Sequence, residues 1–267
     1  MYRAHVKIAV AQISCVLGDV KENLQTIERF AGRAKEGGAE LIVFPEMVDT
    51  GYAMAVIRDH AASWAEGAVP RLRDIARRLS LPVVCGLSER DQQSIFNSQV
   101  VISAEGEIIA RYRKTHLFRP PPIAEDRCFT PGDRLSDFGL GNFRLGLSIC
   151  YDLRFPEIYR QLAVTRQVNA FVVSSAWPFP RIEHFRLLAL ARAIENQSYV
   201  IAANRVGTDD GVTFCGSSSI IDPSGVTLAA ASSDREELIQ ADLSIETVEE
   251  VRRRIDVLAD RRPELYR

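Results

Sequence analysis

Short apolar runs alternate with amphipathic segments along most of the chain. Residues 6–13 predict a strand, residues 22–35 carry apolar side chains at helical spacing and predict a helix, and residues 40–44 predict a buried strand. This order of elements is typical of an α/β protein that contains mixed sheets.

The alternation continues toward the end of the chain, and two hairpins are added to it. Further helices are predicted over residues 70–79, 156–166, 182–196 and 246–258. Further strands are predicted over residues 83–87, 96–103, 108–112, 143–149, 170–174, 199–203, 217–221 and 226–230. A layer of helices on a sheet, formed twice along the chain, would place two sheets face to face with the helices outside.

The composition is that of an ordinary globular protein. Hydrophobic residues make up 46% of the 267 residues, and the net charge of −2 gives no indication of a nucleic-acid or membrane partner. No apolar run approaches the roughly 20 residues of a membrane span, and the N-terminus lacks the layout of a secretory signal. Because no linker or repeat divides the chain, we expect a single domain over residues 1–267.

The cysteines and histidines give no indication of a metal site or a disulfide framework. The five cysteines are odd in number, scattered and without a C-x-x-C pair, and the four histidines show no paired ligand spacing. The chain is therefore expected to carry free thiols in a cytoplasmic location, with no metal and no cofactor.

Cys150 stands where the strand predicted over residues 143–149 breaks into a turn, before a helix that Pro156 opens. A cysteine at such a junction is expected to be partly exposed, and peptide dipoles at a helix N-terminus favour the thiolate. Most cysteines are inert core residues, so this position alone leaves catalysis and packing equally open.

Two further ionisable residues follow predicted strands. Glu46 comes after residues 40–44, and Lys114 comes after residues 108–112. Singly, a glutamate there is more often a turn cap and a lysine more often a solvated surface residue. Together with Cys150 they supply a nucleophile, a base and a cation for developing oxyanion charge, and strand ends are where α/β folds collect such groups.

Three segments resemble the signature blocks of the carbon–nitrogen hydrolase (nitrilase) superfamily, in the family's order. They are Phe-Pro-Glu at 44–46, Tyr-Arg-Lys-Thr-His-Leu at 112–117, and Ile-Cys-Tyr-Asp-Leu-Arg-Phe-Pro-Glu at 149–157. Later segments match as well, at 191–197, 204–207, 221–225 and 260–266. Each block is weak singly, but their order and their spread along the chain make the resemblance strong.

The resemblance implies a fold and a set of roles. The fold is a four-layer αββα sandwich with two mixed β-sheets flanked by helices. Glu46 is the general base, Lys114 stabilises the oxyanion, and Cys150 is the nucleophile. Glu125 matches a second glutamate that the family often carries, and it is expected to orient the substrate or Lys114. The backbone N–H of Tyr151 is expected as a further oxyanion donor.

These forms of the blocks look closest to the ω-amidase and deaminated-glutathione amidase branch, which cleaves terminal amides of short dicarboxylic-acid derivatives. Such a substrate has a carboxylate that suits an arginine fork. Arg154, Arg119 and Arg181 are the candidates, although Arg154 could instead hold the turn in place. Trp177 is a pocket wall or an ordinary packing residue. Phe185 stands where relatives often have tryptophan, and it is expected to border the pocket.

The resemblance also implies a homodimer or a higher homo-oligomer, with the helix and tail of residues 245–267 at a subunit interface. The expected partner is a small-molecule amide. His116 lies in the Lys114 block and is expected to support the loop.

Three other functions stay open. A nitrilase or an N-carbamoyl amino acid hydrolase would use the same triad. A Cys-His peptidase would need His116 or His184 beside Cys150. A non-enzymatic relative would show no reactive thiol.

Overall fold

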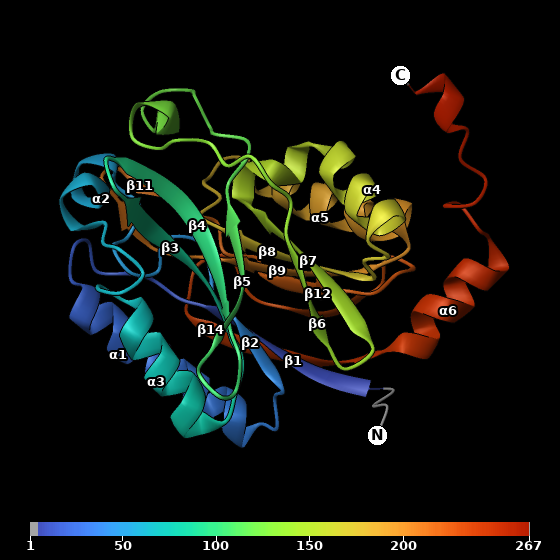
Figure 1. The fold of residues 1–267 in the computed structure, drawn as a ribbon, viewed down its shortest axis with the longest axis horizontal. Coiled ribbons are helices and arrows are strands. Elements are labelled where there is room, and N and C mark those ends of the chain that lie inside the picture. The colour runs from blue at the N-terminus through green and yellow to red at the C-terminus, as the bar shows by residue number, and fades with distance from the viewer. Residues whose placement is uncertain (1–4, 267) are drawn as a thin grey trace.

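The computed structural model describes residues 5–266 and contains two six-stranded mixed sheets (Figure 1). The first sheet has the order β14-β1-β2-β3-β4-β5. Its strands are β1 (His5–Gln12), β2 (Leu41–Val43), β3 (Val83–Asp91), β4 (Ser94–Ile102), β5 (Ile108–Arg113) and β14 (Glu237–Ser244). Strands β1, β2 and β3 are parallel to one another, and the other neighbours are antiparallel.

The second sheet has the order β13-β12-β9-β8-β7-β6 and repeats this plan. Its strands are β6 (Asp137–Leu140), β7 (Phe143–Ile149), β8 (Ala170–Ser175), β9 (Tyr199–Asn204), β12 (Ser219–Ile221) and β13 (Thr227–Ala230). Here β7, β8 and β9 are the parallel strands. Two short strands, β10 (Thr208–Asp209) and β11 (Val212–Thr213), form a separate ribbon.

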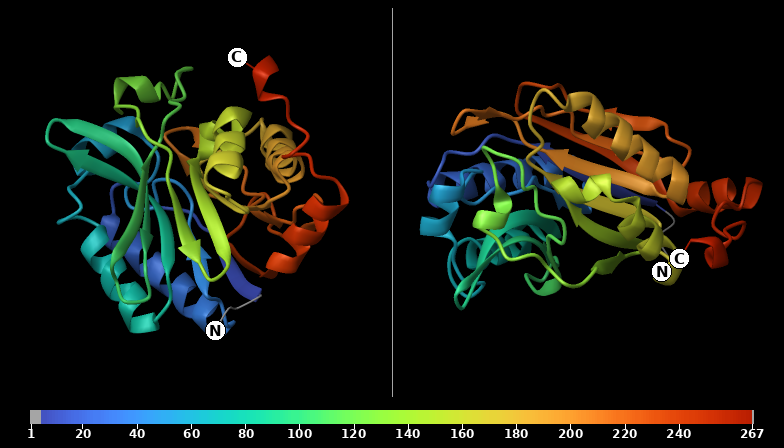
Figure 2. Two further views of the ribbon diagram at one scale, coloured as in Figure 1. Left: turned by 45° about the vertical axis from the view of Figure 1, so that its right-hand side comes forward. Right: turned by 90° about the horizontal axis from the view of Figure 1, so that it is seen from above.

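Helices cover the outer face of each sheet (Figure 2). The first sheet carries α1 (Val20–Glu36) and α3 (Val69–Leu79), and the second carries α4 (Pro156–Thr165) and α5 (Ile182–Asn196). The remaining helices are α2 (Met54–His60), α6 (Ile245–Arg254) and the 3₁₀ turns η1 (Glu125–Arg127), η2 (Cys150–Arg154) and η3 (Pro263–Leu265). The predicted four-layer αββα sandwich is confirmed.

Local sequence explains where the first helix begins and which face it buries. The Asp19 side chain accepts the Glu22 N–H at 2.9 Å and so caps the start of α1, and Gly37 caps its end. Ile27 and Phe30 point into the sheet while charged residues face outward, as the helical spacing predicts.

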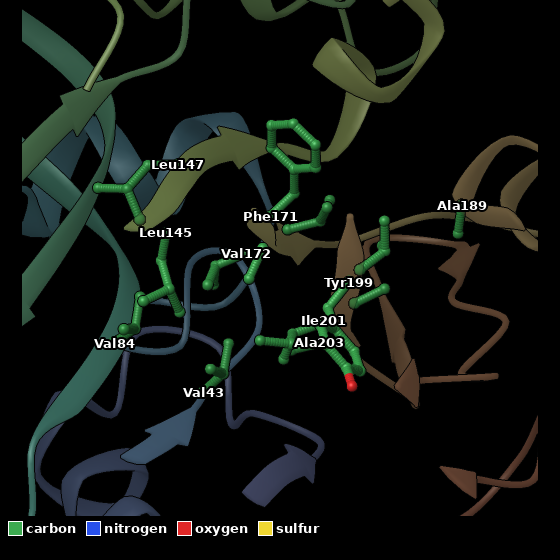
Figure 3. Close-up of a cluster of buried hydrophobic side chains, with 14 of the residues drawn as sticks. Val43, Val84, Leu145, Leu147, Phe171, Val172, Ala189, Tyr199, Ile201 and Ala203 are labelled. Atoms are coloured by element: carbon green, nitrogen blue, oxygen red, sulfur yellow. The ribbon is translucent and has the colours of Figure 1, made fainter. Parts of the chain in front are cut away.

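The two sheets pack face to face around one core (Figure 3). Val43 and Val84 of the first sheet meet Leu145, Val172 and Ile201 of the second, and all are buried. Burying each such side chain contributes roughly 1.5–3 kcal/mol, so this layer joins the halves strongly. The shared core supports one domain, but a single domain over 1–267 stays a prediction, and residues 1–4 and 267 lie outside the described residues.

Some elements differ from expectation at the C-terminal end. The helix predicted over 246–258 stops at Arg254, because Val248 is its only buried residue and the residues that follow are mostly exposed. Strand β14, which the sequence analysis missed, pairs with all eight residues of β1. Beyond α6 the tail extends away from the sandwich (Figure 1), and its place at a subunit interface stays a prediction.

Candidate active site

Four residues from separate loops meet at one end of the facing sheets. Glu46 follows β2, Lys114 follows β5, Glu125 opens η1 and Cys150 opens η2. The Lys114 Nζ lies 2.9 Å from Glu46 Oε1 and 2.8 Å from Glu125 Oε1, and all three side chains are fully buried. Glu46 is therefore no surface turn cap, and Lys114 is no solvated lysine.

Two glycines allow the supporting backbones to come this close. A Cβ on Gly86 of β3 would lie 2.6 Å from the Cα of Glu46. A Cβ on Gly132 would lie 2.1 Å from the carbonyl oxygen of Arg113, next to Lys114. Backbone hydrogen bonds use this proximity, with Gly86 N–H donating to Pro45 at 3.0 Å and Gly132 N–H donating to Lys114 at 2.8 Å.

Both oxygens of the Glu46 carboxylate are held. Oε1 accepts from the Asn97 side chain at 2.6 Å as well as from Lys114, and Oε2 accepts the Ala176 N–H at 2.7 Å. Burial raises the pKa of Glu46, the charge of Lys114 opposes this, and the charge of Glu125 adds to it.

Glu125 is equally constrained. Oε1 accepts from Lys114, from Asn97 at 3.2 Å and from the Tyr52 hydroxyl, while Oε2 accepts the Phe118 N–H at 2.6 Å. Burial acts to lower the pKa of Lys114, but the charges of Glu125 and Glu46 outweigh it and raise that pKa. Lys114 therefore remains an ammonium at any physiological pH.

Cys150 sits on a sharp elbow between β7 and α4. Its φ of 46° is left-handed, a conformation that a non-glycine residue adopts only when its surroundings hold it there. Asp152 supplies part of that support, since its buried carboxylate accepts the Ile149 N–H at 2.9 Å and the Tyr112 hydroxyl at 2.8 Å. The backbone N–H of His116 donates to the same carboxylate at 3.1 Å, and the role of His116 in supporting the loop stays a prediction.

The expectation of a partly exposed thiolate is wrong in both respects. Cys150 is only 7% exposed, and burial raises the pKa of its thiol, with the charge of Glu46 adding to the rise and that of Lys114 opposing it. Cys150 opens η2, which is a single 3₁₀ turn, and the helix α4 begins only at Pro156, so the sulfur does not belong to the first turn of an α-helix. In this structure the sulfur is therefore a thiol that needs a base.

Cys150 lines a pocket with an empty volume of about 300 Å³. The other lining residues are Tyr52, Phe118, Ile123, Tyr151, Arg154, Ala176, Trp177, Pro178 and Arg181. The Arg154 guanidinium lies 4.8 Å from the Trp177 ring centroid, and the Arg181 guanidinium lies 5.4 Å from that of Phe118. Among residues 5–266, neither arginine forms an ion pair.

Three sequence-based expectations about the pocket have clear outcomes. Trp177 is a pocket wall that also packs against Phe185, at 5.5 Å between ring centroids. Phe185 is fully buried behind it and does not line the pocket, so its expected place is wrong. Arg119 is also misplaced, because it is exposed in a separate hollow beside Pro120 and Phe155.

Sequence reasoning missed three further donors to the carboxylates: Asn97 donates to both, the Tyr52 hydroxyl to Glu125 and the Ala176 N–H to Glu46. Only Asn97 carried a usable signal, because three consecutive polar residues, 97–99, lie inside the predicted strand 96–103, and the structure buries them. Within residues 5–266, no group of three or more His, Cys, Asp or Glu is placed to hold a metal ion. No helix in the same range is long and apolar enough to cross a membrane.

Residues 7–253 match the family model described as carbon-nitrogen hydrolase. The chain belongs to that family, as its resemblance indicated, and it is a hydrolase of carbon–nitrogen bonds other than peptide bonds. Membership removes the Cys-His peptidase reading.

Relatives and solved structures match over almost their full length. The chain is 34% identical to the 2-oxoglutaramate amidase of Bacillus subtilis (strain 168), covering 97% of this chain and 98% of that protein. It is 30% identical to the omega-amidase NIT2 of Homo sapiens, covering 96% and 94%. A double mutant of the amidase from Nesterenkonia sp. AN1 in complex with acrylamide has a TM-score of 0.88 at 29% identity, covering 100% and 97%.

Proposed function

We propose that this protein hydrolyses the terminal carboxamide of a short, carboxylate-bearing substrate and releases ammonia through a thioester on Cys150. The observation that carries the proposal is the buried Glu46–Lys114–Glu125 cluster next to Cys150, which lines a pocket with two arginines that form no ion pair within residues 5–266. The names of the 2-oxoglutaramate amidase and omega-amidase relatives support the substrate class. In a mutant of the Nesterenkonia amidase, acrylamide adds to the active-site cysteine, which supports a cysteine nucleophile here.

In the acylation step, Glu46 takes the thiol proton as the sulfur of Cys150 attacks the amide carbon. The carbonyl oxygen becomes an oxyanion. An ammonium has three N–H groups, and Lys114 uses two for Glu46 and Glu125, so the third is left for this oxygen. The backbone N–H of Tyr151, directly after the nucleophile, is the second donor.

Collapse of the oxyanion breaks the carbon–nitrogen bond. Glu46 returns its proton to the departing nitrogen, which leaves as ammonia, and the acyl group remains on sulfur. Glu46 then takes a proton from water as that water attacks the thioester. The carboxylic acid product leaves, and the proton passes back to the sulfur, which restores the thiol. Glu125 holds Lys114 in place throughout through the 2.8 Å ion pair.

The substrate carboxylate is assigned to the arginine side of the pocket. Arg154 and Arg181 both line it, and burial lowers the pKa of Arg154 while the charge of Arg181 adds to the fall. Two neighbouring cations without an acidic partner among residues 5–266 favour binding of an anionic group. Trp177 lies under the Arg154 guanidinium and limits the rotation of the Arg154 side chain.

A matched pair of substrates tests both parts of the proposal. Succinamate and butyramide have chains of the same length, but only succinamate carries a carboxylate. We expect the wild-type protein to release ammonia from succinamate with the higher kcat/KM, and the Cys150→Ala variant to release none. Activity that survives in Cys150→Ala would overturn the mechanism, and a preference for butyramide would overturn the substrate class.

A nitrilase or N-carbamoyl amino acid hydrolase is the second candidate. The chain is 34% identical to a nitrilase of Pyrococcus abyssi, covering 98% of this chain and 99% of that protein. The same assay includes a nitrile and an N-carbamoyl amino acid, and faster ammonia release from either would favour this candidate.

We also infer a homodimer in the cytoplasm. Leu187 and Ile194 of α5 are 61% and 49% exposed, which leaves apolar surface on the outer helix layer that a second copy would cover. The five cysteines are free, as expected in a reducing compartment. Sedimentation of the wild type and a Leu187→Glu variant tests the dimer: a monomeric wild type would contradict it.

A further inference from the structure

Asn97 touches all three members of the buried charged cluster. It lies in β4 and is 1% exposed. Its side-chain nitrogen lies 2.6 Å from Glu46 Oε1 and 3.2 Å from Glu125 Oε1, the same two oxygens that Lys114 binds. Its backbone carbonyl accepts the backbone N–H of Lys114 at 2.8 Å. The side-chain amide therefore bridges the same two carboxylates that the ammonium bridges.

The cluster carries a net negative charge, and the hydrogen bonds from the Asn97 amide stabilise it. Two carboxylates and one ammonium leave a net charge of −1, and the other titratable groups facing Glu46, the Cys150 thiol and the Tyr52 hydroxyl, supply no cation. Two buried carboxylates this close favour uptake of a proton by one of them. A general base in that state cannot act, so the site needs a further donor that brings no charge of its own.

The orientation of the Asn97 amide fits this need. The opposite orientation would place its oxygen against two carboxylates, so the nitrogen must face them. The amide oxygen then has no hydrogen-bond partner among residues 5–266, although it is buried. An amide that leaves its acceptor unpaired is oriented by the carboxylates rather than by a balanced set of hydrogen bonds around it.

We propose that Asn97 is a positioning residue for the reaction, which keeps Glu46 ionised and fixed beside Glu125 and Lys114. This inference rests on the proposed function, since it requires Glu46 to be the general base. The neutral Asn97 amide would then help to stabilise two adjacent negative charges.

The direction of the effect on pH dependence follows from the hydrogen bond. Burial raises the pKa of Glu46, and the bond from Asn97 opposes that rise because it stabilises the ionised carboxylate. Removing the bond raises the pKa further. Less Glu46 is then ionised at neutral pH, and the acidic limb of the kcat/KM profile moves to higher pH.

The test compares pH profiles of succinamate hydrolysis for wild type, Asn97→Leu and Asn97→Ser, with Gln99→Leu as the matched control. Gln99 is a buried amide on the same strand that donates to Ser174 at 2.8 Å and contacts neither carboxylate. We expect both Asn97 variants to move the acidic limb upward by about one pH unit, as loss of a hydrogen bond to a charged group predicts. Gln99→Leu should leave the limb in place.

Two results would overturn the inference. One is a uniform loss of kcat/KM in the Asn97 variants without movement of the limb, which is the behaviour of a merely structural residue. The other is an equal movement in Gln99→Leu. The rate of iodoacetamide labelling of Cys150 against pH gives a second readout, and it should move with the limb if Glu46 takes the thiol proton. A wild type that releases no ammonia from any amide would instead count against the proposed function.

Discussion

The buried cluster and the arginine side of the pocket differ in whether their charged groups have partners. In the cluster, Glu46, Lys114 and Glu125 are fully buried and every charge has a fixed partner. On the arginine side, Arg154 and Arg181 lie over aromatic rings, and within residues 5–266 no carboxylate pairs with them. The contrast indicates that the cluster is organised before a substrate binds, whereas the two arginines are proposed to pair with a carboxylate of the substrate.

This difference predicts different kinetic signatures. Fixed charges in a dry site act on the charge that develops in the transition state, so their loss lowers kcat. Arginines that meet a distant carboxylate bind ground state and transition state alike, so their loss raises KM. The four predictions below test this division.

Lys114→Met should have the largest effect. It removes the proposed oxyanion donor and leaves two buried carboxylates without their cation, so we expect kcat to fall about 10²–10³-fold or more with KM little changed. Lys35→Met, at an exposed lysine in α1, is the control. Steady-state kinetics on succinamate measures both, and a Lys114→Met variant with more than a tenth of wild-type kcat would contradict the role.

Gly86→Ala should lower kcat about a hundredfold, because its Cβ would lie 2.6 Å from the Cα of Glu46 and displace the base. Gly139→Ala is the matched control in a strand, since a Cβ there meets nothing within 4 Å. Unfolding and kinetics are compared for both. Equal kinetics in the two variants would mean that Glu46 tolerates displacement, and the cluster would then not be preorganised.

Arg154→Met and Arg181→Met should each raise the KM for succinamate about tenfold, as expected for a lost charge-assisted hydrogen bond. Neither should change kinetics on butyramide, which has no carboxylate. The variant with the larger KM identifies the main anchor. A fall in kcat on both substrates would mean that the arginines act in the chemical step, as the buried cluster does, and would contradict the distinction between the two regions.

Tyr52→Phe should have the smallest effect. Tyr52 belongs to both regions, because it lines the pocket and its hydroxyl donates to Glu125. Glu125 keeps three other donors, so we expect a loss of about 1 kcal/mol in unfolding free energy and a change in kcat of only a few-fold. Denaturant titration and kinetics measure the two, and a hundredfold fall in kcat would assign Tyr52 a direct part in the chemistry.

Hydrophobic periodicity predicted most of the fold. The strand over 143–149 and the helix over 182–196 have the predicted bounds, because each buries one face or both in the core. Strand β14 was not predicted because apolar and polar residues alternate only weakly over residues 237–244, which are mostly half-buried. Helix α2 was not predicted because only Ile57 of its residues is buried. Pairing with β1 decides the first of these elements, and no local pattern encodes that partner.

The sequence by itself determined the residue types of the site and their family, because the three blocks around Glu46, Lys114 and Cys150 are local strings. Only the tertiary structure decided which groups surround them. In the folded protein Asn97 lies between two carboxylates, and Arg119 lies outside the pocket that Cys150 lines. Burial raises the pKa of the Cys150 thiol. Burial and Coulomb interactions depend on distances between residues remote in the chain, and these distances exist only after the two sheets have packed.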